Sequence, residues 1–370
     1  MRILVVNAGS SSLKLRIIGG NDLVEASEDL AAVNPAGRQG VSDDLPDHLL
    51  AALRRLGDVD AVGHRVVHGG TEFTGAVRLD DAVTERLESF SDLAPLHQPA
   101  SIAALRSARA AMPGVPHVAC FDTAFHATLP PAAATYALPR AWRERWPLRR
   151  FGFHGLSHAY AARRAAALLD RPLEALRIVT CHLGAGASLA AVAGGRTVDT
   201  TMGFTPLEGL VMATRSGSVD PGLLLWLQEQ AGLSVQDVAK GLEHDAGLAG
   251  LAGTADMREV LAALGDSPDA RLAHDVYVHR LRGSIAAMAA AMGGLDAIVF
   301  TGGVGENAPA IRAATVAGLE FLGLAIDVQR NEIASGDREI GPDGQVPGVL
   351  VVNSREDLEI ARQVRALLAG

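Results

Sequence analysis

The chain contains the same short pattern twice, and this repeat constrains the fold more than any other feature. Residues 2–18, RILVVNAGSSSLKLRII, run from an apolar segment through a turn of small and polar residues into a second apolar segment. Residues 177–192, RIVTCHLGAGASLAAV, repeat that order. Each segment predicts two antiparallel strands joined by a short turn. We therefore expect the chain to consist of two related halves.

The first of these turns has a composition that suits phosphate oxygens or a hydrated magnesium ion. Residues 7–12 offer little side-chain bulk, several backbone N–H groups and several hydroxyls, and Lys14 adds a positive charge. An ordinary polar turn has the same composition, so the segment alone leaves both interpretations open.

Length and charge exclude several classes of protein. A chain of 370 residues is too long for one ordinary core and predicts two domains. The formal net charge of −9 argues against nucleic acid or an anionic membrane as the main partner. The longest charge-free apolar stretch, residues 283–295, is too short to cross a bilayer, and the first residues do not resemble a signal peptide. These features favour a cytoplasmic protein.

Two common nucleotide-binding motifs are absent from the sequence. A Walker A motif needs glycine immediately before its lysine, but Lys14 follows Leu13 and Lys240 follows Ala239. The GxGxxG pattern is also absent. In TGGVGEN, residues 301–307, we expect a glycine turn after a buried strand, leading into a helix at Glu306. Such a turn lets a phosphate or sugar approach backbone N–H groups.

Polar residues lie on or after predicted strands. In the strand predicted at 61–70, alternation places Arg65 and Val67 on one face and His64 and His68 on the other, and we expect both histidines to be buried with backbone partners. A second strand runs into Asp122, at the position where ligands meet an α/β sheet. An Asx turn would equally explain Asp122.

The remaining pattern predicts helices and buried thiols. Cys120 and Cys181 end apolar runs and suggest neither a disulfide nor a zinc site. We expect helices over 49–56, 101–112 and 268–292, from Ser157, from Asp220-Pro221, after a Ser234/Asp237 capping box, from Asp256, and at the C-terminus with Ser354 and Asp357 as caps. In that last helix Glu356 could simply favour the helix dipole.

The motifs taken together resemble the acetokinase family. They stand in that family's order and cover the chain from residue 2 to about 362: NAGSSSLK, HRVVHGG, FDTAFH, GFHGLSH, HLGAGAS, DTTMGFTPLEGL, TRSG, ADMRE, TGGVGEN and SREDLEIA. The resemblance implies an α/β fold with two ribonuclease H-like domains of the actin-like ATPase type, with mixed sheets flanked by helices and the active site in the interdomain cleft. The implied domains are residues 1–126 plus about 357–370, and residues 127–356.

The resemblance also implies a reaction. Members of this family carry out reversible, magnesium-dependent, in-line transfer of the ATP γ-phosphate to acetate, giving acetyl phosphate and ADP. Mn²⁺ is an alternative metal, and the family suggests a homodimer.

Site residues are implied by position in the family's motifs. Asp122, His154 and Arg215 match the catalytic residues, and the last two would stabilise the phosphoryl group in flight. Asp122 would help to place magnesium or Arg215, with proton transfer as a lesser alternative. Arg65 matches the arginine that holds the substrate carboxylate, and Asn7 and Glu356 match the pair linked to magnesium. The apolar pocket around the substrate methyl group would consist of Val67, Leu96, Phe153 and Pro206.

The nucleotide-binding positions are implied in the same way. They comprise Lys14, His182, Leu183, Gly184, Ala185, Gly186, Asp256, Met257, Arg258, Gly303, Val304, Gly305, Glu306 and Asn307. The chain departs from the family pattern at Ala185 and Gln98, where the family usually has Asn, in the closing Ser-Arg-Glu-Asp, and in a shorter segment before HRVVHGG. None of these departures removes a charged group.

Two other functions remain open from the sequence. A propionate or butyrate kinase would need only a slightly larger apolar pocket, since one methylene is worth about 1–3 kcal/mol. An actin-like or chaperone-type ATPase, in which the nucleotide drives a conformational change, has the same implied fold. Against that alternative, HRVVHGG, FDTAFH and TRSG supply arginines and an acid that a purely conformational ATPase does not need.

Overall fold

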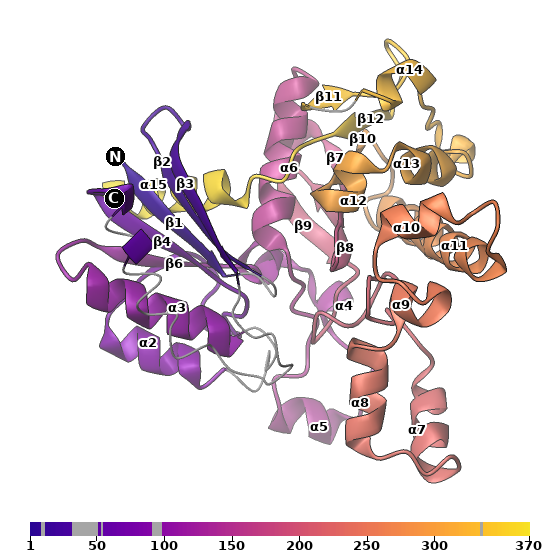
Figure 1. Ribbon diagram of the computed structural model, residues 1–370, viewed down its shortest axis with the longest axis horizontal. Helices are drawn as coiled ribbons and strands as arrows, with labels where there is room; N and C mark the ends of the chain where they lie inside the picture. Colours follow the sequence, from indigo (N-terminus) through magenta and orange to yellow (C-terminus); the bar gives the residue numbers. More distant parts are fainter. Residues whose placement is uncertain (9–11, 32–50, 53–54, 91–97, 334–335) are drawn as a thin grey trace. The chain divides into compact units, whose positions relative to one another are not determined.

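The computed structural model describes residues 1–8, 12–31, 51–52, 55–90, 98–333 and 336–370 (Figure 1). Contacts divide the chain into two compact units. Unit 1 consists of Met1–Ala127, Phe153–Tyr160 and Arg355–Gly370, and unit 2 of Thr128–Gly152 and Ala161–Ser354. Residues 153–160, which we expected in the second domain, therefore belong to unit 1.

Unit 1 contains a six-stranded mixed sheet with the order β3-β2-β1-β4-β6-β5. The β1–β2, β2–β3 and β5–β6 pairs are antiparallel, and the β1–β4 and β4–β6 pairs are parallel. The strands are β1 (Ile3–Ala8), β2 (Ser12–Ile18), β3 (Val24–Ala31), β4 (Ala61–Val66), β5 (Val77–Arg78) and β6 (His117–Phe121).

Unit 2 repeats this topology strand for strand. Its sheet reads β9-β8-β7-β10-β12-β11, with an antiparallel β7–β8–β9 meander, parallel β7–β10 and β10–β12 pairs, and an antiparallel β11 at the edge. The strands are β7 (Arg177–Leu183), β8 (Ala187–Ala193), β9 (Arg196–Thr200), β10 (Ala297–Thr301), β11 (Arg338–Glu339) and β12 (Gly348–Val351). The two hairpins predicted from the repeat are thus confirmed, and each starts one sheet.

Helices flank both sheets. In unit 1 these are α2 (Asp81–Glu88), α3 (Gln98–Ala111) and α15 (Glu356–Ala369), and α6 (Gly155–Leu168) begins in unit 1 and continues into unit 2. Unit 2 contains α4 (Pro131–Ala134), α5 (Arg140–Arg145), α7 (Pro221–Glu229), α8 (Val235–Glu243), α9 (Gly247–Ala252), α10 (Met257–Ala262), α11 (Pro268–Ala291), α12 (Gly302–Asn307), α13 (Pro309–Val316) and α14 (Val328–Asn331).

Local capping rules account for several helix starts. Asp220 accepts a hydrogen bond from the Gly222 N–H at the start of α7, as its sequence predicts. The predicted capping box of α8 is present, with Ser234 and Asp237 bonding each other's backbone N–H groups. Short polar side chains therefore fix where these helices begin.

Three local predictions need correction. The strand predicted at 61–70 ends at Val66, so Val67 lies beyond it. The glycines of TGGVGEN form the first turn of α12 instead of a separate turn, because the Glu306 carboxylate accepts a hydrogen bond from the Gly302 N–H. Ser354 does not cap α15, which begins after Arg355 without a side-chain cap, and Asp357 pairs with Arg355 instead.

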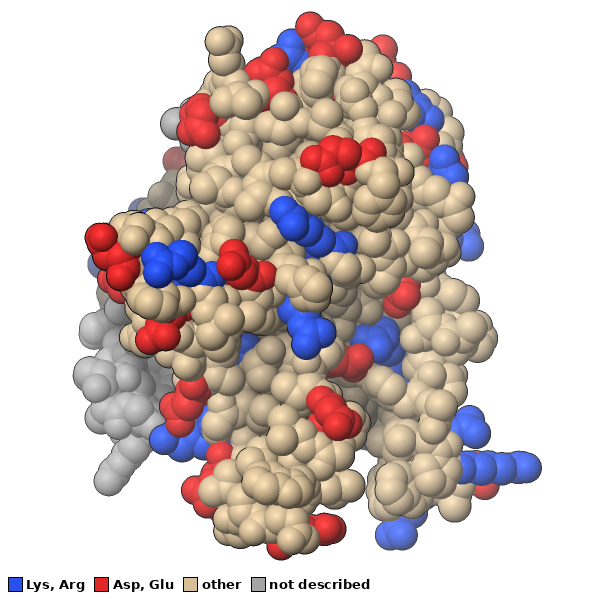
Figure 2. Space-filling view, turned by 90° about the vertical axis from the view of Figure 1, so that its right-hand side faces the viewer, with Lys and Arg blue, Asp and Glu red and all other residues tan. Residues whose placement is uncertain are grey.

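Some predictions fall on residues outside the described ranges. These are the loop at 34–47, part of the helix at 49–56, residues 9–11 of the first turn, and Leu96. Among the described residues, no helix is both long and apolar enough to span a membrane. Acidic and basic side chains are interspersed among larger uncharged areas on the described part of the face in Figure 2.

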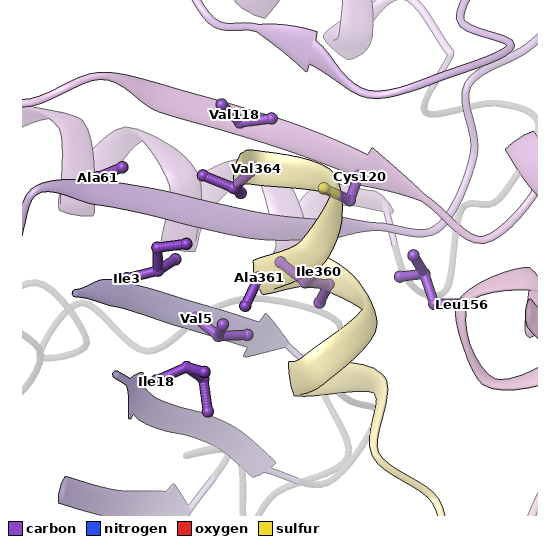
Figure 3. Packing of buried hydrophobic residues seen from close by; sticks show 10 residues of the cluster. All are labelled: Ile3, Val5, Ile18, Ala61, Val118, Cys120, Leu156, Ile360, Ala361 and Val364. Atoms are coloured by element: carbon purple, nitrogen blue, oxygen red, sulfur yellow. The ribbon is translucent and has the colours of Figure 1, made fainter. Parts of the chain in front are cut away.

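The C-terminal helix packs against one face of the unit 1 sheet. Figure 3 shows Ile360, Ala361 and Val364 of α15 packed among Ile3 and Val5 of β1 and their neighbours, and the cluster is fully buried. A Cβ at residue 63 of β4 would lie 2.5 Å from Ile360 Cγ2, so glycine allows the helix to approach this closely. Burial of this apolar surface holds the last helix on the first strands.

This packing predicts a difference between two substitutions on α15. Ile360→Ala removes a fully buried side chain and should lower the free energy of unfolding by about 2–5 kcal/mol. Leu367→Ala, at a position that is 38% exposed, should cost about 0.5 kcal/mol or less. Urea unfolding followed by circular dichroism measures both. Equal losses would contradict the packing of α15 on the sheet.

Candidate functional site

A charged cluster lies at the carboxyl ends of the central strands of unit 1. Asn7 is near the end of β1, Arg65 is near the end of β4, and Asp122 follows β6 directly. Because these strands are parallel neighbours, their carboxyl ends meet at one edge of the sheet. Glu356, the first residue of α15, joins the cluster because α15 packs on this sheet.

Arg65 is the hub of the cluster. Its Nε and Nη2 atoms donate hydrogen bonds to the two Asp122 carboxylate oxygens at 3.0 and 2.7 Å. Its Nη1 donates to Asn7 Oδ1 at 3.2 Å and lies 3.3 Å from Glu356 Oε2. Asn7 Nδ2 in turn donates to Glu356 Oε2 at 2.9 Å. Residues from both ends of the chain are thus bound to one guanidinium group.

Burial and the neighbouring opposite charges shift the pKa values of Arg65 and Asp122 in opposite directions. The side chains of Arg65 and Asp122 are only 14% and 2% exposed. Burial raises the pKa of Asp122, and the charge and hydrogen bonds of Arg65 oppose that rise. Burial alone would lower the pKa of Arg65, but the Asp122 and Glu356 carboxylates raise it above its ordinary value. Removing Arg65 would leave the buried Asp122 carboxylate without its ion-pair partner, which is strongly destabilising.

Lys14 lies close to Asn7 in the sheet register. Asn7 and Lys14 are directly opposite on β1 and β2, so their side chains project from the same face. The Lys14 side chain is exposed. The structure therefore brings the predicted lysine to the face that carries Asn7.

The segment after Gly152 places His154 against Asp122. His154 has a φ of 57°, and its backbone N–H donates a hydrogen bond to the Asp122 carboxylate. The Gly155 N–H donates to the Asp122 backbone oxygen at 2.9 Å, and a Cβ at 155 would lie 2.2 Å from that oxygen. The adjacent Phe153 carbonyl is 3.0 Å from His126 Nε2. Two successive backbone contacts therefore fix His154 beside the carboxylate.

Two predicted apolar residues of unit 1, Val67 and Phe153, are buried close to this segment. Val67 is 6% exposed and Phe153 is 1% exposed. The His68 ring packs edge-on against Phe153 with centroids 5.5 Å apart. His68 Nδ1 accepts a hydrogen bond from the Gly70 N–H, as a buried histidine with a backbone partner should. His64 differs from the prediction, because its Nε2 lies 2.9 Å from the His117 Nδ1 atom instead of a backbone group.

In unit 2 the second hairpin turn and α12 lie side by side. His182 is the register partner of Thr301, and Gly302 follows with a φ of 79°. A Cβ on Gly302 would lie 2.8 Å from the Leu183 carbonyl oxygen, so only glycine allows this approach. The predicted segments 182–186 and 303–307 are therefore brought together.

The polar side chains of α12 have local partners. The Glu306 carboxylate accepts hydrogen bonds from the Gly302 and Ser354 N–H groups at 2.9 and 2.8 Å. The Asn307 amide donates to the Gly303 carbonyl at 2.9 Å. Glu306 therefore stabilises the start of its own helix.

The loop that carries Arg215 contacts the second hairpin turn. The Ala213 N–H donates to the Ala185 carbonyl oxygen at 3.1 Å. Arg215 Nη1 donates to the Pro206 carbonyl oxygen at 3.1 Å, which also brings the predicted pocket residue Pro206 next to Arg215. Burial lowers the pKa of Arg215, and Glu243 partly opposes this. The contact between Ala213 and Ala185 uses the backbone of residue 185. It does not depend on the Asn side chain that the family usually has at this position.

Asp256 and Arg258 lie at the start of α10 and pair with each other. Asp256 accepts from the Arg258 N–H as the helix N-cap, and its carboxylate also binds the Arg258 side chain. These bonds lower the pKa of Asp256 to about 2. The Met257 side chain is buried. A nucleotide role for these residues stays a prediction.

Tyr136, Arg150 and Glu208 form a further polar cluster that the sequence motifs do not predict. These side chains bond one another and the segment 201–204 in unit 2. Glu208 lies in the glycine-rich DTTMGFTPLEGL motif, which is a weak signal for it, whereas no sequence pattern marked Tyr136.

The donor atoms in unit 1 suit a hard divalent cation. Among the described residues, no group of three or more His, Cys, Asp or Glu side chains could hold a metal ion by itself. Asn7 Oδ1 and the Glu356 carboxylate can supply oxygen ligands to a metal ion. The hydrogen bond from Asn7 Nδ2 to Glu356 Oε2 holds the two side chains close together. Mg²⁺ is commonly bound through one or two carboxylates together with substrate phosphates and waters. The residues present therefore fit magnesium as an ion shared with a phosphate ligand.

Comparisons with known proteins agree over most of the chain. A model of the acetokinase family matches residues 25–362. The acetate kinase of Leifsonia xyli subsp. xyli is 47% identical over an alignment that covers 100% of this chain and 99% of that protein. A crystal structure of the acetate kinase from Porphyromonas gingivalis has a TM-score of 0.89 at 33% identity and covers 99% of both chains.

A solved propionate kinase is about as similar in structure. The protein from Francisella tularensis subsp. tularensis SCHU S4 has a TM-score of 0.87 at 35% identity and covers 98% of both chains. The full-length relative and the family model, which spans most of the sequence, show that this chain belongs to the acetokinase family.

Proposed function

We propose that the chain is an acetate kinase that transfers the γ-phosphoryl group of ATP reversibly to acetate, giving acetyl phosphate and ADP. An acetate oxygen forms the new bond to phosphorus while the bond to the ADP oxygen breaks. The acetate carboxylate carries no proton at neutral pH, so no general base is needed. The observation that carries the proposal is the Arg65 guanidinium, held by Asp122 at the strand ends of a chain in the acetokinase family.

The geometry of Arg65 supports a role in binding the substrate carboxylate. Asp122 occupies the Nε and Nη2 edge of the guanidinium. A second carboxylate would therefore bind through the edge formed by Nη1 and Nη2, where it would share Nη1 with Asn7 and Glu356. We assign Asp122 the task of orienting Arg65, which replaces the expected task of placing magnesium or Arg215. Binding one carboxylate oxygen leaves the other free to attack phosphorus.

Charge neutralisation is the second requirement of the reaction. Negative charge spreads over the oxygens of the phosphoryl group in the transition state, so catalysis depends on positioning and positive groups. We assign this task to Arg215 and His154. Asn7 and Glu356 would hold Mg²⁺, or Mn²⁺, which would neutralise phosphate charge when bound.

The remaining assignments concern nucleotide and substrate size. The segments 182–186 and 303–307, with Lys14 and residues 256–258, would hold ATP. Val67, Leu96, Phe153 and Pro206 would surround the acetate methyl group. A propionate kinase remains the second candidate, because a solved propionate kinase has a TM-score of 0.87 to this chain.

The proposal extends to assembly and location. We assign the chain as a cytoplasmic homodimer on the family resemblance. Exposed apolar side chains in unit 2 support a surface that a second copy could cover, among them Leu225, Trp226 and Val235.

Trapping of the product tests the proposed reaction. With ATP, Mg²⁺ and hydroxylamine, acetate should give acyl hydroxamate, and kcat/KM for acetate should exceed that for propionate by about tenfold or more, since the pocket rejects one methylene. A reaction without acetate is the control. Hydrolysis of ATP that is independent of acetate would favour the conformational ATPase, and a preference for propionate would favour the second candidate.

The two arginines should affect different kinetic constants. Arg65→Lys keeps a charge beside Asp122 but loses the planar fork, so it should raise KM for acetate about tenfold or more with kcat within about threefold. Arg215→Lys should lower kcat about a hundredfold with KM for acetate within about threefold, because its contact forms mainly in the transition state. Steady-state kinetics measures both variants. Equal changes of both constants in both variants would count against this division.

A further inference from the structure

The side chains of Tyr136, Arg150 and Glu208 hold the segment 201–208, which contains the Pro206 carbonyl group bound by Arg215. Arg150 Nη2 donates to Glu208 Oε1 at 2.7 Å, and its Nη1 donates to the Thr201 and Met202 carbonyl oxygens at 3.1 and 3.0 Å. The Arg150 guanidinium also lies over the Tyr136 ring, 5.5 Å from its centroid. Arg150 thus connects the backbone of residues 201 and 202 to the Glu208 side chain.

The Tyr136 hydroxyl closes the same segment into a loop. It accepts a hydrogen bond from the Phe204 N–H at 2.9 Å and donates to Glu208 Oε2 at 2.5 Å. A Cβ on Gly203 would lie 1.8 Å from Glu208 Oε2 and 2.2 Å from the Tyr136 hydroxyl, so the cluster fits only against glycine. One hydroxyl therefore holds Phe204 and Glu208, the positions two residues to either side of Pro206.

Pro206 transmits this constraint to Arg215. Its carbonyl oxygen accepts the hydrogen bond from Arg215 Nη1 at 3.1 Å. Proline has no backbone N–H, and its φ angle is restricted. Because Phe204 and Glu208 are held on either side of Pro206, the direction of the Pro206 carbonyl group is fixed. The Arg215 guanidinium that donates to this carbonyl oxygen is thereby held in one orientation.

We propose that Tyr136, Arg150 and Glu208 are positioning residues that aim Arg215 through the Pro206 carbonyl group. The proposal rests on the role assigned above to Arg215 in stabilising the phosphoryl group. None of the three needs to touch a substrate. Their charges and hydroxyl act by holding the loop, and a displacement of about 1 Å in a catalytic group can cost about a hundredfold in rate.

Tyr136→Phe tests the proposal because it removes only the bridging hydroxyl. We expect kcat to fall about tenfold to a hundredfold while KM for acetate changes less than about twofold. A residue that merely stabilises the fold would lower the unfolding temperature without this selective loss of kcat. An unchanged kcat in Tyr136→Phe would overturn the proposal.

A double-mutant cycle with Arg215→Lys tests whether the effect passes through Arg215. If it does, adding Tyr136→Phe to Arg215→Lys should lower kcat by less than about twofold further. If the two losses multiply, the proposal alone is overturned. If Arg215→Lys by itself is fully active, the role of Arg215 and this proposal are both overturned. Glu208→Gln, which keeps the side-chain size, is measured in the same cycle and decides the question if Tyr136→Phe does not fold.

Asp296→Asn is the matched control. It weakens the partly buried ion pair between Arg177 and Asp296 in unit 2. This pair lies at the start of β7 and β10, at the opposite end of the strands from residues 182–186. It should leave kcat unchanged. A loss of kcat equal to that of Tyr136→Phe would show general destabilisation of unit 2 and would overturn the proposal.

Discussion

The pair formed by Arg65 and Asp122 is the interaction on which the unit 1 site depends. A buried ion pair is not in itself a source of stability, because desolvation offsets much of the attraction. Its value here is positional, since two parallel hydrogen bonds fix the plane of the guanidinium. Asn7 and Glu356 then take their places around the remaining nitrogen. The apolar packing of α15 against β1 and β4 is what brings Glu356 to this edge.

The same sheet topology carries different residues at its strand ends in the two units. In unit 1 the strand ends carry a charged cluster centred on one arginine. In unit 2, Gly302 at the start of α12 permits a close approach to the Leu183 backbone beside the hairpin turn. In the proposed reaction, the first copy of this scaffold would bind the substrate carboxylate and the second would bind the phosphates.

Much of the fold could be predicted from the sequence because it rests on local signals. The two hairpins, the Asp220 and Ser234 helix starts and the strand leading to Asp122 all follow from short patterns. The start of α15 could not be predicted from the sequence. Asp357 can cap a helix or pair with a neighbouring arginine, and the sequence does not show that it pairs with Arg355. Family motifs named Arg65 and Glu356. The Tyr136 cluster was missed because its partners are joined only by folding.

The magnesium dependence of the Glu356→Gln variant measures directly whether the cluster around Arg65 holds the metal. If Glu356 links α15, Arg65 and the metal, loss of its charge should raise the Mg²⁺ concentration for half-maximal activity about tenfold or more. Asp357→Asn, the neighbouring carboxylate on α15, should leave that concentration unchanged. If Glu356→Gln needs no more Mg²⁺ than the unaltered protein, or if both substitutions shift the requirement equally, Glu356 does not link this cluster to the metal.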